Sequence, residues 1–169
     1  MEVAYREIHN KLKIKEMQET GTTEKGRVAE EIASKWLEAH GLEVLERNWR
    51  HHHLELDIIA EGPMLSSEGM PVSCGSPFLK QDSFLHIVEV RSRKAVLRTG
   101  AAPEEPVSPL IAPQLTVDYR KRRFLVSAAD AFVRQRHIKQ EVVFDIVSIV
   151  FSESSHVLSF YPDAFHPLW

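Results

Sequence analysis

Acidic residues interrupt two strongly apolar segments of this 169-residue chain. Asp57 lies in LELDIIA (residues 54–60), and Glu89 lies in FLHIVEVR (residues 84–91). A buried carboxylate without a partner is costly, and neighbouring carboxylates repel each other. If the two segments are adjacent strands, Asp57 and Glu89 require a cation between them. Mg²⁺, or Mn²⁺ in its place, suits this position because it takes oxygen ligands from one or two carboxylates, water and phosphate.

The alternative for these carboxylates is structural. Glu89 would then form an ion pair with Arg91 or Arg93, and Asp57 would cap a turn. Charged residues are common at strand ends, and structural ion pairs are common among them. Spacing alone therefore favours the structural alternative over a metal site.

Two further charged residues point inward on helical wheels. In a helix that Thr22 or Thr23 is expected to cap and Gly41 to end, Glu30 lies at the edge of the apolar stripe, whereas Glu31 points away from it. In a second helix, expected over residues 118–136, Lys121 lies along the buried stripe. Both side chains are expected to approach the sheet, although spacing also allows Glu30 to be an ordinary exposed glutamate.

The elements that must position these residues follow from hydrophobic periodicity. The apolar positions of the second helix include Phe124. Strand alternation places Leu54, Leu56 and Ile58 on one face of their strand. The 84–91 strand is expected in the middle of a sheet because both of its faces are apolar. The expected strands cover residues 42–48, 54–61, 84–91, 142–151 and 157–161, the first two forming an antiparallel hairpin.

The length fits one domain. Residues 1–21 are charged and weakly periodic, so we expect an N-terminal arm outside the core, with a single domain over residues 22–169. Residues 62–83 hold three prolines and are expected to form a loop insertion. The lone Cys74 excludes an internal disulfide, and no apolar stretch is long enough to span a membrane. We therefore expect a cytoplasmic protein without a membrane partner.

The formal net charge of −3 excludes a positive field over the whole molecule. Residues 85–136 nevertheless carry ten basic side chains against five acidic ones. This half of the chain is therefore the expected polyanion-facing surface, where phosphate contacts depend on salt and not on base sequence. Arg120 and Arg123 are expected on the solvated face of the second helix. The expected nucleic-acid contacts are Arg93, Lys94 and Arg122.

Several segments, taken in order, resemble a known family. They are GRVAEEIASKWLEAHGLEVLERNWR, LELDIIA, FLHIVEVRSR, KRRFLVSAADAF, FDIV and DAF, which together span most of residues 26–165. This order is similar to that of the YraN family of small bacterial proteins, predicted nucleases distantly related to archaeal Holliday-junction resolvases. The resemblance implies an α/β fold of the PD-(D/E)xK nuclease superfamily. Its restriction-endonuclease-like core has a central mixed β-sheet of about five strands flanked by helices.

The resemblance also implies roles for individual residues. Asp57 and Glu89 would hold Mg²⁺ together with the Val90 carbonyl and waters. Glu30 would support the site through a water or a second metal, and Lys121 would position the scissile phosphate with an arginine. The implied catalytic residues are Glu30, Asp57, Glu89, Arg91 and Lys121.

The chain departs from the family pattern in three places. Arg91 replaces a usual lysine, Ala29 replaces a usual second glycine, and residues 62–83 look like an insertion. Arginine stays protonated and cannot activate water as a base, but it can stabilise charge on a transition state. Asp145 matches an aspartate of a family strand, from which it would orient Lys121 or an arginine.

The sequence is consistent with three functions. The first is a Mg²⁺-dependent DNA endonuclease that hydrolyses phosphodiester bonds, with branched or repair-intermediate DNA as its expected substrate. The second is a catalytically degenerate nucleic-acid-binding protein, in which Arg91 records lost catalysis. The third is a protein-interaction module with structural acids. A resolvase-like role would need a twofold-symmetric homodimer, which the sequence leaves open.

Overall fold

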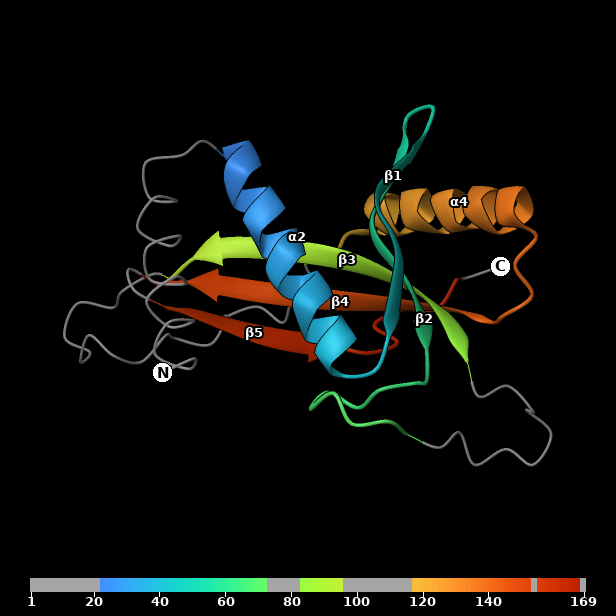
Figure 1. The fold of residues 1–169 in the computed structure, drawn as a ribbon. Coiled ribbons are helices and arrows are strands. Elements are labelled where there is room, and N and C mark those ends of the chain that lie inside the picture. The colour runs from blue at the N-terminus through green and yellow to red at the C-terminus, as the bar shows by residue number, and fades with distance from the viewer. Residues whose placement is uncertain (1–21, 73–82, 96–116, 153–154, 168–169) are drawn as a thin grey trace.

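The computed structural model describes residues 22–72, 83–95, 117–152 and 155–167 (Figure 1). The expected arm over residues 1–21 and part of the expected insertion, residues 73–82, lie outside this described set. Each expected strand and each expected helix falls within it. The sequence-based division into an arm and one domain stays a prediction.

The described strands form one five-stranded mixed sheet, in the order β1-β2-β3-β4-β5. Neighbouring strands are antiparallel, except that β3 and β4 run parallel. The apolar β3 is central, as predicted for a strand covered on both faces. An α/β fold with a five-stranded mixed sheet is therefore confirmed. The strands are β1 (Glu43–His51), β2 (Leu54–Gly62), β3 (Phe84–Lys94), β4 (Val142–Phe151) and β5 (His156–Tyr161).

Two described helices cover opposite faces of this sheet (Figure 1). They are α2 (Thr22–Ala39) and α4 (Tyr119–Arg136). Gly41, just beyond the end of α2, has a φ of 91°, which favours glycine. The α2-side core contains Ala33, Leu37, Ile58, Val88, Val147 and Ile149. The α4-side core contains Leu125, Phe132, Leu56, Ile59, Ile87 and Ile146.

The buried face of α4 is narrower than predicted. Leu125 and Phe132 are buried, but Phe124 remains 39% exposed. Adjacent helical residues lie about 100° apart, and Phe124 turns toward solvent while Leu125 faces the sheet. Phe124 is therefore an apolar position of α4 that the structure does not bury.

The alternation of side chains along β2 is interrupted between Leu56 and Ile58. Leu56 packs in the α4-side core, whereas Ile58 packs in the α2-side core, so the prediction that they share a face is wrong. The register explains the change, because the ladder with β1 has no pair between Asn48 and Asp57. Asn48 adopts a φ of 54°, which rotates β1 at the same level.

The described first half of the expected insertion packs against the domain. Leu65 is buried in the α2-side core and forms an isolated bridge with Pro71. Gly69 adopts a φ of 80°, and a Cβ at this position would collide with the ring of His40. Glycine at this position allows the chain to pass close to His40, which follows α2. Within the described residues, no helix is long and apolar enough to cross a membrane.

A buried polar pair joins β3 to β4. His86 Nδ1 lies 2.7 Å from Asp145 Oδ2, and both side chains are almost fully buried. Asp145 Oδ1 also accepts the N–H of Asp163 at 2.9 Å, which fixes the segment after β5. Among the described residues, Asp145 therefore contacts His86 and Asp163, and not Lys121 or an arginine as its family position implied.

This pair predicts a large loss of stability on truncation. In Asp145→Ala, His86 and the Asp163 N–H lose their buried partner, so the free energy of unfolding should fall by about 3 kcal/mol or more. Urea denaturation measures this change. The control Asp130→Ala removes an exposed pair with Arg134 and should cost less than about 1 kcal/mol. Similar losses in both variants would contradict a structural role for Asp145.

Candidate functional site

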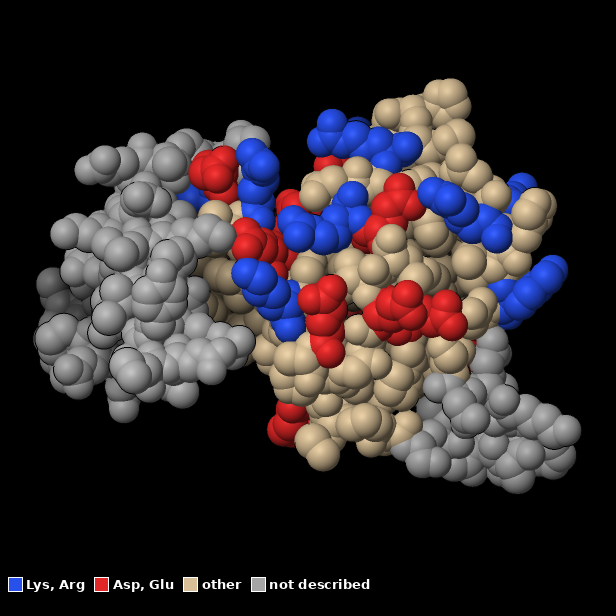
Figure 2. Space-filling model, in the orientation of Figure 1, with Lys and Arg blue, Asp and Glu red and all other residues tan. Residues whose placement is uncertain are grey.

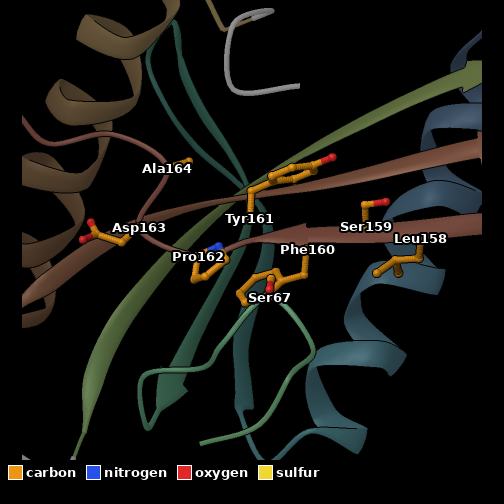
Figure 3. Close-up of a pocket in the computed structure, with 8 residues that line it drawn as sticks. All are labelled: Ser67, Leu158, Ser159, Phe160, Tyr161, Pro162, Asp163 and Ala164. Carbon is orange, nitrogen blue, oxygen red and sulfur yellow. The ribbon is translucent and has the colours of Figure 1, made fainter. Parts of the chain in front are cut away.

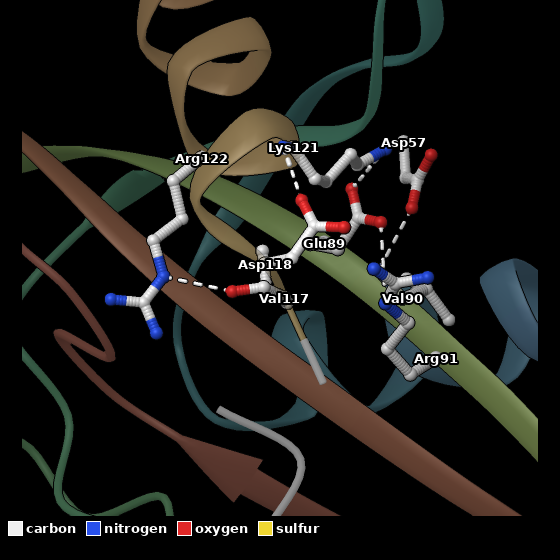
Figure 4. Close-up of polar contacts among 8 residues, drawn as sticks. All are labelled: Asp57, Glu89, Val90, Arg91, Val117, Asp118, Lys121 and Arg122. Atoms are coloured by element: carbon white, nitrogen blue, oxygen red, sulfur yellow. Dashed lines mark hydrogen bonds and ion pairs between the residues drawn. The ribbon is translucent and has the colours of Figure 1, made fainter. Parts of the chain in front are cut away.

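The ladder between β2 and β3 opens beside two carboxylates (Figure 4). Ile58 and Val88 are its last pair, and the next register position places Asp57 opposite Glu89. Asp57 Oδ2 instead accepts the N–H of Val90 at 2.8 Å. A side chain thus replaces the strand-to-strand hydrogen bond. Because directly opposed residues share a face, the opening brings two carboxylates together.

Glu89 is buried among cations. Its side chain is 4% exposed, and Oε2 lies 2.9 Å from Lys121 Nζ. Arg91 Nε lies 3.5 Å from Oε1, at the outer limit of a hydrogen bond. Within the described part of the chain, neither Glu89 Oε2 nor Arg91 Nε has a partner with hydrogen-bond geometry. Charge surrounds this carboxylate, but its hydrogen-bonding capacity is not filled.

Burial shifts the pKa of both acids. Burial and the nearby Asp57 carboxylate raise the pKa of Glu89 to about 7, although Lys121 and Arg91 oppose the shift. Burial also raises the pKa of Asp57, against the Val90 hydrogen bond and the charge of Lys121. Burial therefore favours the protonated form of both acids, even though Lys121 and Arg91 lie close to them.

The start of α4 positions Lys121. Asp118 caps the helix, and its Oδ1 accepts the N–H of Lys121 at 2.8 Å. The cap fixes Lys121 in the first turn, from which its ammonium reaches Glu89 and interacts electrostatically with Asp57 (Figure 4). The inward direction predicted for Lys121 is confirmed.

Glu30 contacts β1 and not the acids of the site. Its Oε2 accepts a hydrogen bond from the side-chain amide of Asn48 at 2.7 Å. Asn48 lies at the level of Asp57, where the β1–β2 ladder has no pair. Within the described residues, Glu30 therefore binds Asn48, and no contact joins it to Asp57 or Glu89. Sequence reasoning missed Asn48, although asparagine tolerates a positive φ better than most residues.

The three expected nucleic-acid contacts occupy different surroundings. Arg93 and Lys94 are exposed at the end of β3, and the charge of Lys94 helps burial to lower the pKa of Lys25. Arg122 is half-buried, with Nε donating to the Val117 carbonyl at 2.9 Å (Figure 4). Its guanidinium lies over the Phe165 ring. Because successive strand residues point to opposite faces, Arg93 and Lys94 do not share a face, and Lys94 lies near Lys25 of α2. Arg122 points away from Glu89 (Figure 4).

The visible surface mixes both signs of charge. Figure 2 shows basic and acidic side chains interspersed over the face that carries α2. A hollow of about 490 Å³ lies elsewhere, between Ser67 and the end of β5 (Figure 3). Asp163 is the one charged residue that lines it, and its N–H is bound to Asp145. The hollow therefore does not extend the Asp57–Glu89 site.

The donor set fits a hard divalent ion that brings further ligands with it. Among the described residues, no group of three or more His, Cys, Asp and Glu side chains could hold a metal. Asp57 and Glu89 supply two carboxylates, and Lys121 Nζ lies 2.9 Å from Glu89 Oε2. Mg²⁺ commonly binds one or two carboxylates and completes its shell with water and phosphate. Two carboxylates on neighbouring strands agree with that chemistry.

The raised pKa of Glu89 predicts how stability depends on pH. Between its ordinary value of 4.5 and about 7, the folded chain holds a proton that the unfolded chain releases. The free energy of unfolding should therefore fall as pH rises through this range, by up to about 3 kcal/mol. Glu89→Gln cannot titrate and should lose this fall. Urea denaturation in metal-free buffer at several pH values measures both proteins.

A matched control separates Glu89 from general charge effects. Glu46→Gln removes a carboxylate that pairs with Arg136 near the surface, so it should retain the wild-type pH dependence. The same pH slope in wild type and Glu89→Gln would contradict a buried, proton-binding Glu89.

Comparison with known proteins agrees with the resemblance drawn from the sequence segments. The model described as "Uncharacterised protein family UPF0102" matches residues 29–149. A UPF0102 protein of Parabacteroides distasonis is 34% identical over 83% of this chain and 91% of its own length. A relative from Bacteroides thetaiotaomicron is 31% identical over 85% and 93%, respectively. One from Porphyromonas gingivalis is 33% identical over 76% and 73%. The chain therefore belongs to the YraN-like UPF0102 family.

Proposed function

We propose that this protein is a Mg²⁺-dependent endonuclease that hydrolyses phosphodiester bonds in DNA. The observation that carries the proposal is the opposed pair of buried carboxylates, Asp57 and Glu89, with the Lys121 ammonium beside them. Two acids and a lysine on neighbouring elements supply both a metal-binding charge and a phosphate-binding charge.

We also propose that the domain has a restriction-endonuclease-like core. A five-stranded mixed sheet with a helix on each face supports this assignment, as does the placement of the acids on β2 and β3. In the same proposal, residues 22–169 act as one domain, and residues 62–83 are an insertion in it.

Asp57 and Glu89 would hold the metal ion, with the Val90 carbonyl and waters completing its ligands. When bound, Mg²⁺ lowers the pKa of a coordinated water and stabilises charge that develops on the phosphate. The ion would also neutralise the carboxylate repulsion that raises the pKa of Glu89. Lys121 would then be released from its ion pair with Glu89.

The basic side chains would bind the substrate. Lys121 and Arg91 lie next to Glu89, so they can hold the scissile phosphate close to the carboxylates. Arg91 keeps its proton and thus serves for binding and charge stabilisation only. Asn48 would support the site by fixing Glu30 near Asp57. Because Arg91 cannot take up a proton, any proton transfer during hydrolysis would involve the carboxylates or Lys121.

One observation favours the catalytically degenerate alternative. Arg91 and Lys121 contact the two oxygens of Glu89, so the chain's own cations partly neutralise this acid. A protein that only binds nucleic acid would need no more than this. It would bind DNA in a salt-dependent manner without metal-dependent cleavage.

Cleavage with matched acid variants distinguishes the two functions. With Mg²⁺ or Mn²⁺, wild type should cleave at least one of linear, flapped and four-way-junction DNA. Asp57→Asn and Glu89→Gln remove metal-binding charge and should lower the rate by about a hundredfold or more. Glu61→Gln, on the same strand as Asp57, should leave the rate unchanged. Full activity in either site variant, or DNA binding without any cleavage, would overturn the proposal.

The role of the lysine has its own test. Lys121→Met removes the phosphate-binding ammonium and should reduce cleavage by about a hundredfold. Arg134→Met removes an exposed cation from the last turn of the same helix, so its rate should stay close to wild type. Equal effects of the two substitutions would show that α4 contributes only general positive charge.

A further inference from the structure

The outer face of α4 carries exposed aromatic rings next to arginines. A shallow hollow of about 310 Å³ lies on this face. Tyr119 is 67% exposed and Phe124 is 39% exposed, which is unusual for rings so close together on one helix. We call this surface the aromatic platform. Its residues are Tyr119, Arg120, Arg123, Phe124 and Ser127.

Each ring of the platform has a guanidinium partner. Arg120 lies over the Phe124 ring at 5.8 Å, and Arg123 lies over the Tyr119 ring at 5.9 Å. His53, from the turn of the β1–β2 hairpin, meets Phe124 edge to face at 6.0 Å. These contacts hold the rings at the surface. The nearest acid in sequence, Asp118, is engaged in capping α4.

The platform shares two elements with the proposed catalytic site. Tyr119 and Arg120 directly precede Lys121 on α4, and His53, which contacts Phe124, lies in the hairpin that carries Asp57. A ligand bound along the platform would therefore lie on the helix that supplies Lys121. It would meet cations and flat apolar faces in alternation.

We propose that the aromatic platform binds unpaired nucleotides of single-stranded DNA, its rings stacking on bases and its arginines contacting phosphates. This inference rests on the proposed function and names the part of the substrate that the site holds. Stacking on aromatic side chains suits every base. Bases inside a duplex are already stacked, so Tyr119 and Phe124 gain nothing from paired DNA. The substrate is thus DNA with an unpaired segment, such as a flap or a branch point.

The binding test uses metal-free protein, so that cleavage does not interfere. Fluorescence anisotropy measures the affinity for labelled oligothymidine of about 15 nucleotides and for a duplex of equal length, both in EDTA. Phe124→Ala and Tyr119→Ala should each weaken oligothymidine binding about tenfold and change duplex binding less than about twofold. Phe124→Trp keeps a ring and should bind as wild type does.

Controls separate stacking from charge and from exposure. Val157→Ala removes an equally exposed apolar side chain from β5 and should not change either affinity. Arg123→Gln should lower the affinity for both probes and reduce the salt dependence of binding. A phosphate contact is the same whether the bases are paired or unpaired. Circular dichroism confirms that each variant is folded.

Four results would overturn the platform. In the first, both ring variants bind oligothymidine as tightly as wild type does; in the second, they lose affinity equally for oligothymidine and duplex. In the third, wild type does not bind oligothymidine. In the fourth, wild type is a dimer that Phe124→Ala dissociates. The last result would assign the surface to a second copy of the chain. If cleavage depends on Glu89 but Phe124→Ala binds oligothymidine normally, the platform proposal is wrong and the endonuclease proposal stands. If binding depends on the rings but no metal-dependent cleavage occurs, the endonuclease proposal is wrong and the platform proposal stands.

Discussion

The opening of the β2–β3 ladder is the constraint on which the rest of the site depends. Antiparallel register forces Asp57 and Glu89 to face each other, and the Val90 N–H that would bond across the strands is taken by Asp57. Two carboxylates so close in a buried place are costly unless cations surround them. Lys121 meets this need only because Asp118 caps α4 at the right turn. The helix start, the strand opening and the raised pKa of Glu89 are thus parts of one arrangement.

Much of the fold could be predicted from the sequence, since periodicity reports burial. The central position of β3 follows from its apolar run, and the inward direction of Lys121 follows from the helical wheel. The face change in β2 could not be predicted, because alternation assumes an unbroken ladder. The unpaired position between Asn48 and Asp57 breaks that assumption. Asn48 itself carries no periodic signal.

The long-range contact partners of individual polar residues also could not be predicted from the sequence. Asp145 was expected near a cation, but its partner His86 comes from the adjacent parallel strand, 59 residues earlier. Phe124 fitted the apolar pattern of its helix equally well as a core residue or a surface residue. Only the position of the sheet decides which of two neighbouring residues is buried. The family resemblance named the acids of the site, but it could not indicate that Arg123 and Phe124, which belong to one of its segments, form an exposed aromatic platform.

The net charge of −3 takes a different meaning in this arrangement. Part of the acidity lies in the buried pair, where a bound ion would offset it, and Lys121 and Arg91 lie at the same opening. Recognition would then combine local phosphate contacts with stacking, and would not depend on long-range attraction. This agrees with the mixture of charges on the visible surface (Figure 2).

The location of a bound metal ion tests the central claim most directly. Mn²⁺ broadens NMR signals of nearby nuclei, so a titration of the isotope-labelled protein locates the ion without any substrate. We expect broadening centred on the backbone amides of Asp57, Glu89 and Val90, and its loss in Glu89→Gln. Broadening centred on the histidines of the β1–β2 turn, or no localised broadening at all, would contradict a metal site at the opening of the ladder.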